Sequence, residues 1–355
     1  MNNGNYRGRG VITNSPNRFE KLHIDTSGFE DNDLSESDDD ASPVRTEYYR
    51  DHSRSILAKN ESPDIGAGYS MNPYRGCEHG CVYCYARPTH EYLGFSAGLD
   101  FETKIMVKHD AAELLEREFA NKSWEPQPVF FSGNTDCYQP AERALGITRK
   151  CLEVFRRFQN PVVVITKSSL VRRDADILGE LSGLNLAKVI ITITTLNKGL
   201  QSKLEPRASA PQRRLDTIEH LAKNNVKVGV NVAPVIPGLT DEEIPEIIKR
   251  SAESGASFAG RVILRLPHSV KEIFAEWLKN NMPDRAGKVL NRVREMHGGK
   301  LYDHAYGKRL TGEGVWAETI RTVYDNACRK HGLNEDSFHL DRTKFRREGN
   351  QYSMF

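Results

Sequence analysis

Three cysteines, Cys77, Cys81 and Cys84, form the part of this 355-residue sequence with the clearest chemical meaning. Their spacing is C-x3-C-x2-C, and Gly76 and Gly80 give the loop the backbone freedom to wrap closely around a bound group. Three thiolates can bind three irons of a cubane [4Fe–4S] cluster and leave the fourth iron open, because such clusters otherwise take four cysteines. The spacing therefore predicts an iron–sulfur cluster with an open iron.

The alternative is a structural zinc site in which His79 is the fourth ligand. Structural zinc sites usually use two C-x2-C pairs or a distant histidine pair. The remaining cysteines, Cys137, Cys151 and Cys328, are isolated in the sequence, so the cluster is favoured. Three cysteines within eight positions are also unlike a disulfide framework, and we expect a protein of a reducing compartment, the cytoplasm.

Short apolar runs alternate with amphipathic stretches from about residue 68 onwards. A weak strand is expected around 68–74, and clearer strands are expected at 128–133, 161–168, 187–195, 226–236 and 260–267. Near-continuous apolar strands separated by helices are typical of a parallel sheet covered by helices. Six such units predict an α/β fold, a partial, open (β/α)6 TIM-like barrel; a doubly wound open sheet is the alternative.

Composition and charge divide the chain into three expected parts. Residues 1–60 lack hydrophobic periodicity and contain the acidic run at 29–40, which predicts a disordered N-terminal tail. Residues 61–268 form the expected barrel with its cluster, and residues 269–355 form an expected helical extension. The net charge of +2 gives no strong electrostatic field, and no apolar run is long enough to span a membrane.

The cysteine motif, with Tyr83 just before its last cysteine, resembles the signature of the radical SAM superfamily. The string CEHGCVYCY is similar to the spore photoproduct lyase branch. SGNTDCYQPAE, ITKS and PVIPGLTD resemble an uncharacterised bacterial group in that branch, described as DNA repair photolyase-like. The resemblance covers about residues 65–270. It implies a radical SAM barrel, a [4Fe–4S] cluster and S-adenosylmethionine (SAM) as cofactors, and a one-electron reductant of flavodoxin or ferredoxin type as a partner.

The chemistry implied by this resemblance is reductive. The reduced cluster passes one electron to SAM, which gives methionine and a 5′-deoxyadenosyl radical that abstracts hydrogen from a substrate. The expected substrate is a nucleic acid or nucleotide-like molecule, such as a DNA lesion. A protein side chain or small metabolite is the alternative substrate, and a non-catalytic zinc module is the alternative from another class. No membrane partner is expected, and the oligomeric state stays open.

Polar residues follow two of the expected strands at the ends where β/α barrels carry their active sites. Ser132, Asn134 and Asp136 follow the strand at 128–133 and offer acceptors for the SAM amino group. Lys167 and Ser168 end the strand at 161–168. A lysine at the end of an apolar strand needs a partner for its ammonium group, and the SAM carboxylate would serve.

Later strands contribute further candidates. Thr194 is expected near the SAM ribose, Asn231 and Tyr83 near its adenine, and Arg265 and His268 near the substrate. The resemblance also implies two catalytic residues, because spore photoproduct lyase uses a cysteine and a nearby tyrosine to return hydrogen to the product radical. Tyr85 is the candidate tyrosine, because it directly follows the last cysteine of the motif. Cys137 is the candidate cysteine, because it follows the expected strand at 128–133. The alternative for Cys137 is a small buried hydrophobic residue.

Overall fold

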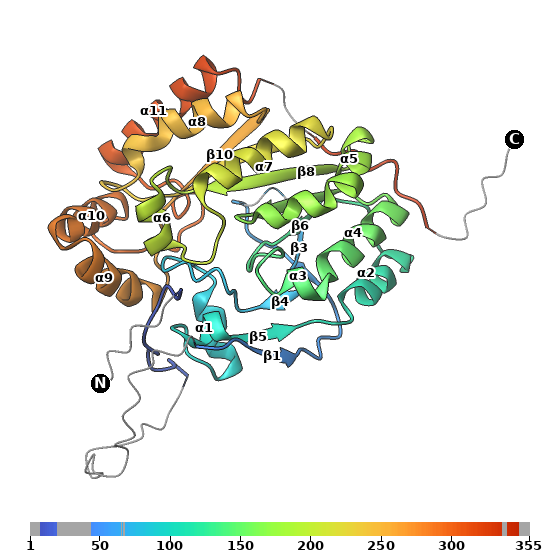
Figure 1. Cartoon of the computed structure of the whole chain (residues 1–355), viewed down its shortest axis with the longest axis horizontal. Coiled ribbons are helices and arrows are strands. Elements are labelled where there is room, and N and C mark those ends of the chain that lie inside the picture. The colour runs from blue at the N-terminus through green and yellow to red at the C-terminus, as the bar shows by residue number, and fades with distance from the viewer. Residues whose placement is uncertain (1–7, 20–43, 65, 67, 336–338, 348–355) are drawn as a thin grey trace, which may run out of the picture.

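A computed structural model of the chain describes residues 8–19, 44–64, 66, 68–335 and 339–347. These residues contain a seven-stranded sheet with the order β10-β9-β8-β7-β6-β3-β2 and a three-stranded sheet with the order β1-β5-β4. Helices α4, α5, α7 and α8 lie along the outside of the larger sheet (Figure 1). No described helix is long and apolar enough to cross a membrane.

The larger sheet contains the six strands that the sequence predicts. They are β3 (Tyr69–Met71), β6 (Val129–Phe131), β7 (Val162–Thr166), β8 (Ala187–Ile193), β9 (Val228–Val235) and β10 (Phe258–Ile263). Each pairs in parallel with the next one along the chain. The short strand β2 (Leu57–Lys59) adds to β3 in the antiparallel direction. Strands β10 and β2 are the edges of this sheet, which makes it the expected partial (β/α)6 barrel rather than a closed one.

Apolar residues on alternate positions of these strands pack against the surrounding helices. In β8, Val189, Ile191 and Ile193 are buried in the main core, whereas Lys188 and Ile190 between them are half-buried on the other face. This alternation gives the sheet a helix-facing side and a barrel interior. The helices that follow the strands are α2 (Ala111–Ala120), α3 (Glu142–Leu145), α4 (Ile147–Phe158), α5 (Ala175–Gly183), α6 (Lys198–Leu204), α7 (Pro211–Lys223) and α8 (Ile244–Glu253).

The N-terminal region differs from the disordered tail expected over residues 1–60. Strand β1 (Glu47–Arg50) pairs in parallel with β5 (Lys104–Val107), which also pairs with β4 (Tyr74–Arg75). The guanidinium of Arg9 donates to the carbonyl of Glu102 at 2.8 Å and to the hydroxyl of Thr46 at 3.0 Å. These polar contacts fasten residues 8–19 and 44–59 to the barrel, although neither segment has a periodic apolar pattern. The acidic run at 29–40 lies outside the described residues.

The C-terminal extension is helical, as predicted. Its helices are α9 (Val270–Asn281), α10 (Pro283–Met296) and α11 (Gly314–Lys330), and α11 packs against α8. The loop between α10 and α11 contacts both edges of the open barrel. Ile263 at the end of β10 donates its N–H to the carbonyl of Leu310 at 2.9 Å, and Arg309 forms an ion pair of 2.6 Å with Asp64, beyond β2. This loop therefore bridges the gap that strand pairing leaves.

Candidate active site

The cysteine loop follows β3 and β4 and is held by backbone contacts. The N–H of Cys77 donates to the carbonyl of Phe101 at 2.9 Å. Gly76 and Gly80 have φ values of +79° and +68°, a conformation that side chains disfavour. A Cβ on Gly80 would also lie 2.7 Å from the carboxylate of Glu102. Both glycines are needed for the loop to adopt this path, as the sequence predicts.

The three thiols lie in one environment that fits a cluster better than a single zinc ion. Cys77 and Cys81 are buried and Cys84 is half-buried. Burial raises the pKa of Cys77, and the neighbouring Asp136, Cys81 and Cys84 raise it further, so the groups interact electrostatically. In the described part of the chain, however, no three His, Cys, Asp or Glu side chains are grouped closely enough to hold one metal ion. The nitrogen Nδ1 of His79 instead lies 3.4 Å from Asp136.

This arrangement bears directly on the zinc alternative. Four tetrahedral ligands of one zinc ion lie roughly 3.8 Å from one another, whereas a cubane cluster places four irons between its thiolates. Three thiols of one short loop, which interact electrostatically, therefore suit the cluster. Cys77, Cys81 and Cys84 are the residues that would hold it.

A buried ion pair lies beneath the cysteine loop. Arg87 is fully buried, donates from Nε to the carbonyl of Cys81 at 2.9 Å, and pairs with Glu102 at 2.5 Å. The remaining donors of Arg87 bind two backbone carbonyls. The carboxylate of Glu102 also accepts the N–H groups of Gly10 and Val11 at 2.9 and 3.1 Å. This pair thus joins the cysteine loop to the N-terminal segment.

A second buried pair lies on another side of the same loop. The fully buried Glu205 pairs with Arg214 and accepts hydrogen bonds from the hydroxyl groups of Tyr83 and Thr194. Burial alone would raise the pKa of Glu205, but Arg214, Lys167 and these two hydrogen bonds lower it below its usual value. The carboxylate is therefore held ionised beside the aromatic residue of the motif. Tyr83 and Thr194 thus donate their hydroxyl groups to Glu205, and their predicted contacts with adenine and ribose stay predictions.

Lys167 is brought to the cysteine loop, as the sequence predicts. Its ammonium nitrogen lies 5.9 Å from the centroid of the Tyr83 ring. Burial alone would lower the pKa of Lys167, but Cys81 and Glu205 raise it above its usual value. No carboxylate lies within ion-pair distance of Lys167 among the described residues. A charged ammonium without a carboxylate partner can pair with an anionic group.

The polar loop after β6 is organised by Asp136. Its carboxylate accepts the Thr166 hydroxyl at 2.7 Å and the Lys167 N–H at 2.8 Å, and it faces His79. Burial alone would raise the pKa of Asp136, but His79 and these hydrogen bonds lower it to about 2. Asp136 therefore joins the ends of β6 and β7, and its oxygens are already occupied by protein donors.

The other predicted residues of this loop have separate environments. Ser132, with φ of +76°, accepts the N–H of Cys137 at 2.7 Å. The amide oxygen of Asn72 accepts the N–H of Asn134 at 2.9 Å, whereas the Asn134 side chain has no hydrogen-bond partner among the residues described. Of the predicted acceptors, Asn134 is thus the one whose side chain remains available.

Tyr85 and Cys137, predicted as catalytic residues, differ in exposure. The Tyr85 hydroxyl donates to the carbonyl of Gly133 at 2.5 Å, and the Arg265 guanidinium lies 3.9 Å from the Tyr85 ring centroid. Tyr85 keeps 39% of its surface exposed. Cys137 is fully buried in the main core, where burial raises its pKa. This burial favours the alternative of a small core residue for Cys137, and its role as a hydrogen donor stays a prediction.

Ser168 and Asn231 were also predicted to contact SAM. Ser168 accepts the N–H of Leu170 at 3.3 Å and caps the short 3-10 helix η3 (Ser169–Asp174). Asn231 does not follow its strand but lies inside β9, where it pairs in register with Thr192 and Gly260. The apolar run extends past Asn231 to Val235, so the strand continues through it. Their contacts with SAM stay predictions.

Sequence reasoning missed the residues that support the loop. Asn72, Arg87, Glu102, Glu205 and Arg214 all bind groups of the loop or its neighbours. Asn72 lies five residues before the first cysteine and could have been singled out by position. The four charged residues have no local pattern that separates them from solvent-exposed charges.

Comparison with known proteins agrees with this geometry. Residues 71–250 match the model of the Radical SAM superfamily. An uncharacterised protein of Mycobacterium tuberculosis is 33% identical over 245 residues, which cover 68% of this chain and 71% of that protein. The radical SAM Nalpha-GlyT isomerase of Pseudomonas phage M6 is 26% identical over 325 residues, covering 82% of this chain and 65% of that protein.

The fold also matches a solved structure. Spore photoproduct lyase complexed with dinucleoside spore photoproduct superposes with a TM-score of 0.59 at 16% identity, over 81% of this chain and 80% of that one. This likeness concerns the fold. With the family match over half of the sequence and the mycobacterial relative, the chain belongs to the radical SAM superfamily, whose members use a [4Fe–4S] cluster and SAM.

Proposed function

We propose that this radical SAM enzyme cleaves SAM reductively at a cluster held by Cys77, Cys81 and Cys84 and abstracts hydrogen from a nucleotide-like substrate. The observation that carries the proposal is that the ammonium of Lys167, after the end of β7, lies beside the cysteine loop that follows β3 and β4. When bound, the cluster and SAM would supply an electron and a 5′-deoxyadenosyl radical. The protein binds, orients and shields these groups.

Lys167 and Asn134 are the residues we assign to the methionine end of SAM. The carboxylate of SAM would meet Lys167, which has no carboxylate of its own at contact distance within the described residues. The amino group needs an acceptor, and the Asn134 amide oxygen has no competing donor there. Asp136 is a positioning residue, because its oxygens hold the strand ends that present both groups.

Tyr85 is the residue we assign to the substrate side. It directly follows the last cysteine, and its partly exposed ring lies between the Gly133 carbonyl and the Arg265 guanidinium. A phenol in this place can contact a molecule that enters from the mouth of the barrel. Because Cys137 is buried in the core, we assign the substrate contact to Tyr85 alone.

The substrate class follows from two similar proteins. The phage relative is named a radical SAM Nalpha-GlyT isomerase, and the solved lyase holds a dinucleoside spore photoproduct. Both names support a nucleotide-like substrate, such as a modified base or a DNA lesion, for this chain. Superfamily members generally need an external one-electron reductant, and we propose a flavodoxin or ferredoxin type. All six cysteines are free thiols, which supports a reducing compartment, the cytoplasm.

The test uses anaerobically reconstituted protein with SAM, dithionite and three kinds of candidate substrate. These are a thymine-lesion dinucleoside, an oligonucleotide that carries the same lesion, and a lysine-rich peptide. We expect 5′-deoxyadenosine to form in every arm, and substrate-dependent product only with the nucleotide-like probes. Product from the peptide alone would contradict the substrate class, and no 5′-deoxyadenosine in any arm would contradict the reaction.

A further inference from the structure

A second feature of the barrel mouth is a basic cavity that the cofactors do not account for. It has a volume of about 300 Å³, within the range of small-ligand sites. It is formed where β10 leads into α9 and by the loop that follows α10. Its lining residues are Leu266, His268, Lys271, Lys300, Leu301, Tyr302 and His304. We call it the basic cavity.

The basic cavity begins next to the cysteine loop. Arg265 lies against the ring of Tyr85, one residue after the last cysteine. The next residue, Leu266, is fully buried in the apolar cluster that contains Cys81 and Tyr83, and it also lines the cavity. A molecule in the basic cavity would therefore lie beside the part of the site assigned to the substrate.

The lining carries cations and no carboxylate. Among the described residues, Lys271 has only its sequence neighbour Glu272 within ion-pair distance, at 3.7 Å, and both side chains are exposed, where such a pair contributes little. Burial lowers the pKa of His268; Arg18, His304 and Lys271 lower it further, whereas Glu91 raises it. His268 also has φ of +49°, a strained conformation for a residue with a side chain.

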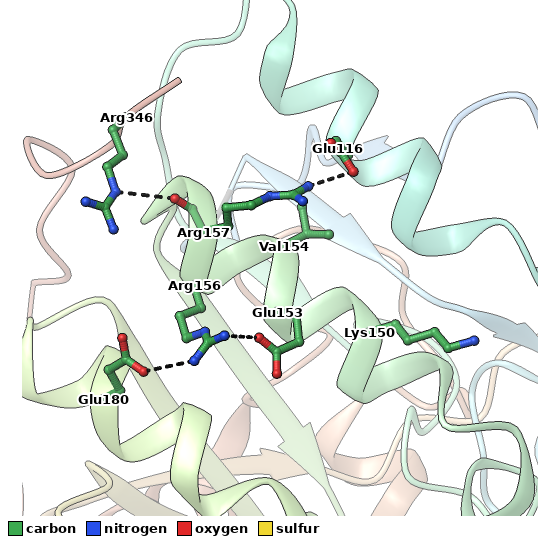
Figure 2. A pocket seen from close by; sticks show the side chains of 8 residues that line it. All are labelled: Glu116, Lys150, Glu153, Val154, Arg156, Arg157, Glu180 and Arg346. Atoms are coloured by element: carbon green, nitrogen blue, oxygen red, sulfur yellow. Dashed lines mark hydrogen bonds and ion pairs between the residues drawn. The ribbon is translucent and has the colours of Figure 1, made fainter. Parts of the chain in front are cut away.

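Another cavity of the molecule shows how cations are neutralised elsewhere. Its volume is about 560 Å³, and it lies between α2, α4, α5 and the C-terminal segment (Figure 2). There Arg156 lies 2.6 Å from Glu153 and 3.4 Å from Glu180, and Arg157 lies 2.6 Å from Glu116. This paired cavity is larger, yet Arg156 and Arg157 in its lining already have carboxylate partners.

We propose that the basic cavity is a phosphate-binding subsite for the substrate, with Lys271 and Lys300 as its principal ligands and Tyr302 as an aromatic wall. SAM carries a net positive charge, so this lining disfavours it, whereas a nucleotide phosphate is attracted to it. The inference rests on the proposed nucleotide-like substrate and adds that the substrate carries a phosphate near the reacting group. The phosphate and the reacting group would lie on either side of Arg265.

The experiment measures binding of a short fluorescein-labelled oligodeoxythymidylate to the anaerobically reconstituted chain by anisotropy over a series of salt concentrations. The site variant is K271A/K300A, and the matched control is K150A/R156A in the paired cavity, which removes the same charge. We expect the site variant to bind about tenfold more weakly and to lose roughly 1.4 from its salt slope, as for two single-strand phosphate contacts. The control is expected to bind as the wild type does.

Two further arms make the outcome specific. Lys271→Arg with Lys300→Arg keeps the charge and should restore binding, and inorganic pyrophosphate should compete with the oligonucleotide in the wild type, the arginine variant and the control, but not in K271A/K300A. Wild-type affinity in K271A/K300A, or equal weakening in the control, would overturn the subsite. Binding is read without turnover, so this failure differs from failure of the proposed function, which would be an absence of 5′-deoxyadenosine from wild-type protein.

Discussion

Two buried arginine–glutamate pairs flank the cysteine loop, and they differ in what they hold. Arg87–Glu102 binds backbone groups of the loop and of the N-terminal segment. Arg214–Glu205 binds the side chains of the motif and its neighbours, including Tyr83. The Arg87–Glu102 pair therefore fixes the path of the loop, whereas the Arg214–Glu205 pair sets the charges around its sulfur atoms.

The largest expected effect is the loss of stability when either pair is broken. In Glu102→Gln and in Glu205→Gln, a fully buried guanidinium loses its counter-charge, and we expect each change to lower the free energy of unfolding by about 3–5 kcal/mol. Urea unfolding of the metal-free chain measures this. Glu180→Gln, in an exposed pair with Arg156, is the control and should change stability by less than about 0.5 kcal/mol. Similar losses in all three variants would contradict the structural role of the buried pairs.

The region around Arg87 and Glu102 should also make the free energy of unfolding depend on pH under acidic conditions. His90 packs against Phe101 there, and burial lowers its pKa to about 4. Its unfolded pKa is higher, near 6.5, so the unfolded chain binds the proton first. The stability that neutral His90 contributes is complete above about pH 6.5 and is lost as the pH falls to 4, by about 3 kcal/mol. His90→Gln should flatten the unfolding free energy over this pH window; an unchanged profile would contradict the assignment.

A smaller loss of stability is expected for a substitution at Gly10, where the N-terminal segment contacts the cysteine loop. A Cβ on Gly10 would lie 1.7 Å from the carbonyl oxygen of Gly80. Gly10→Ala must displace the segment from the loop, and we expect a loss of about 1–3 kcal/mol in stability. Faster amide hydrogen exchange in residues 77–84 would show that the segment covers the loop. Gly66→Ala, at a position with open space, is the control.

The smallest expected effect is a difference between the two pairs in how strongly their glutamates influence the reactivity of Cys81. Burial and then Glu205 raise the pKa of the Cys81 thiol, and Glu102 is not among the main contributors to that pKa. Removing the Glu205 charge should speed alkylation of Cys81 in the metal-free chain a few-fold relative to Glu102→Gln, measured by mass spectrometry at a fixed pH. The buried Cys151 serves as the internal reference for unfolding. Equal acceleration in both variants would show that the two pairs do not differ in this way.

The fold was largely predictable because strands of apolar residues and the helices between them carry local periodic signals. The cysteine loop was predictable for a similar reason, since its ligands lie within eight residues. The buried pairs were not, because Arg87 and Glu102 are charged residues that only the tertiary structure brings together. The burial of Cys137 was not predictable, because its position after a strand does not reveal whether a side chain faces the barrel mouth or the core.

The central claim is that Cys77, Cys81 and Cys84 hold the cluster at which SAM is cleaved. The most direct measurement compares the wild type, Cys81→Ala and the control Cys328→Ala after anaerobic reconstitution, by iron and sulfide content and by 5′-deoxyadenosine formed with SAM and dithionite. We predict about four irons and four sulfides per chain for the wild type and the control, with loss of cluster and of 5′-deoxyadenosine in Cys81→Ala. Zinc without sulfide in the wild type, or undiminished SAM cleavage by Cys81→Ala, would contradict the claim.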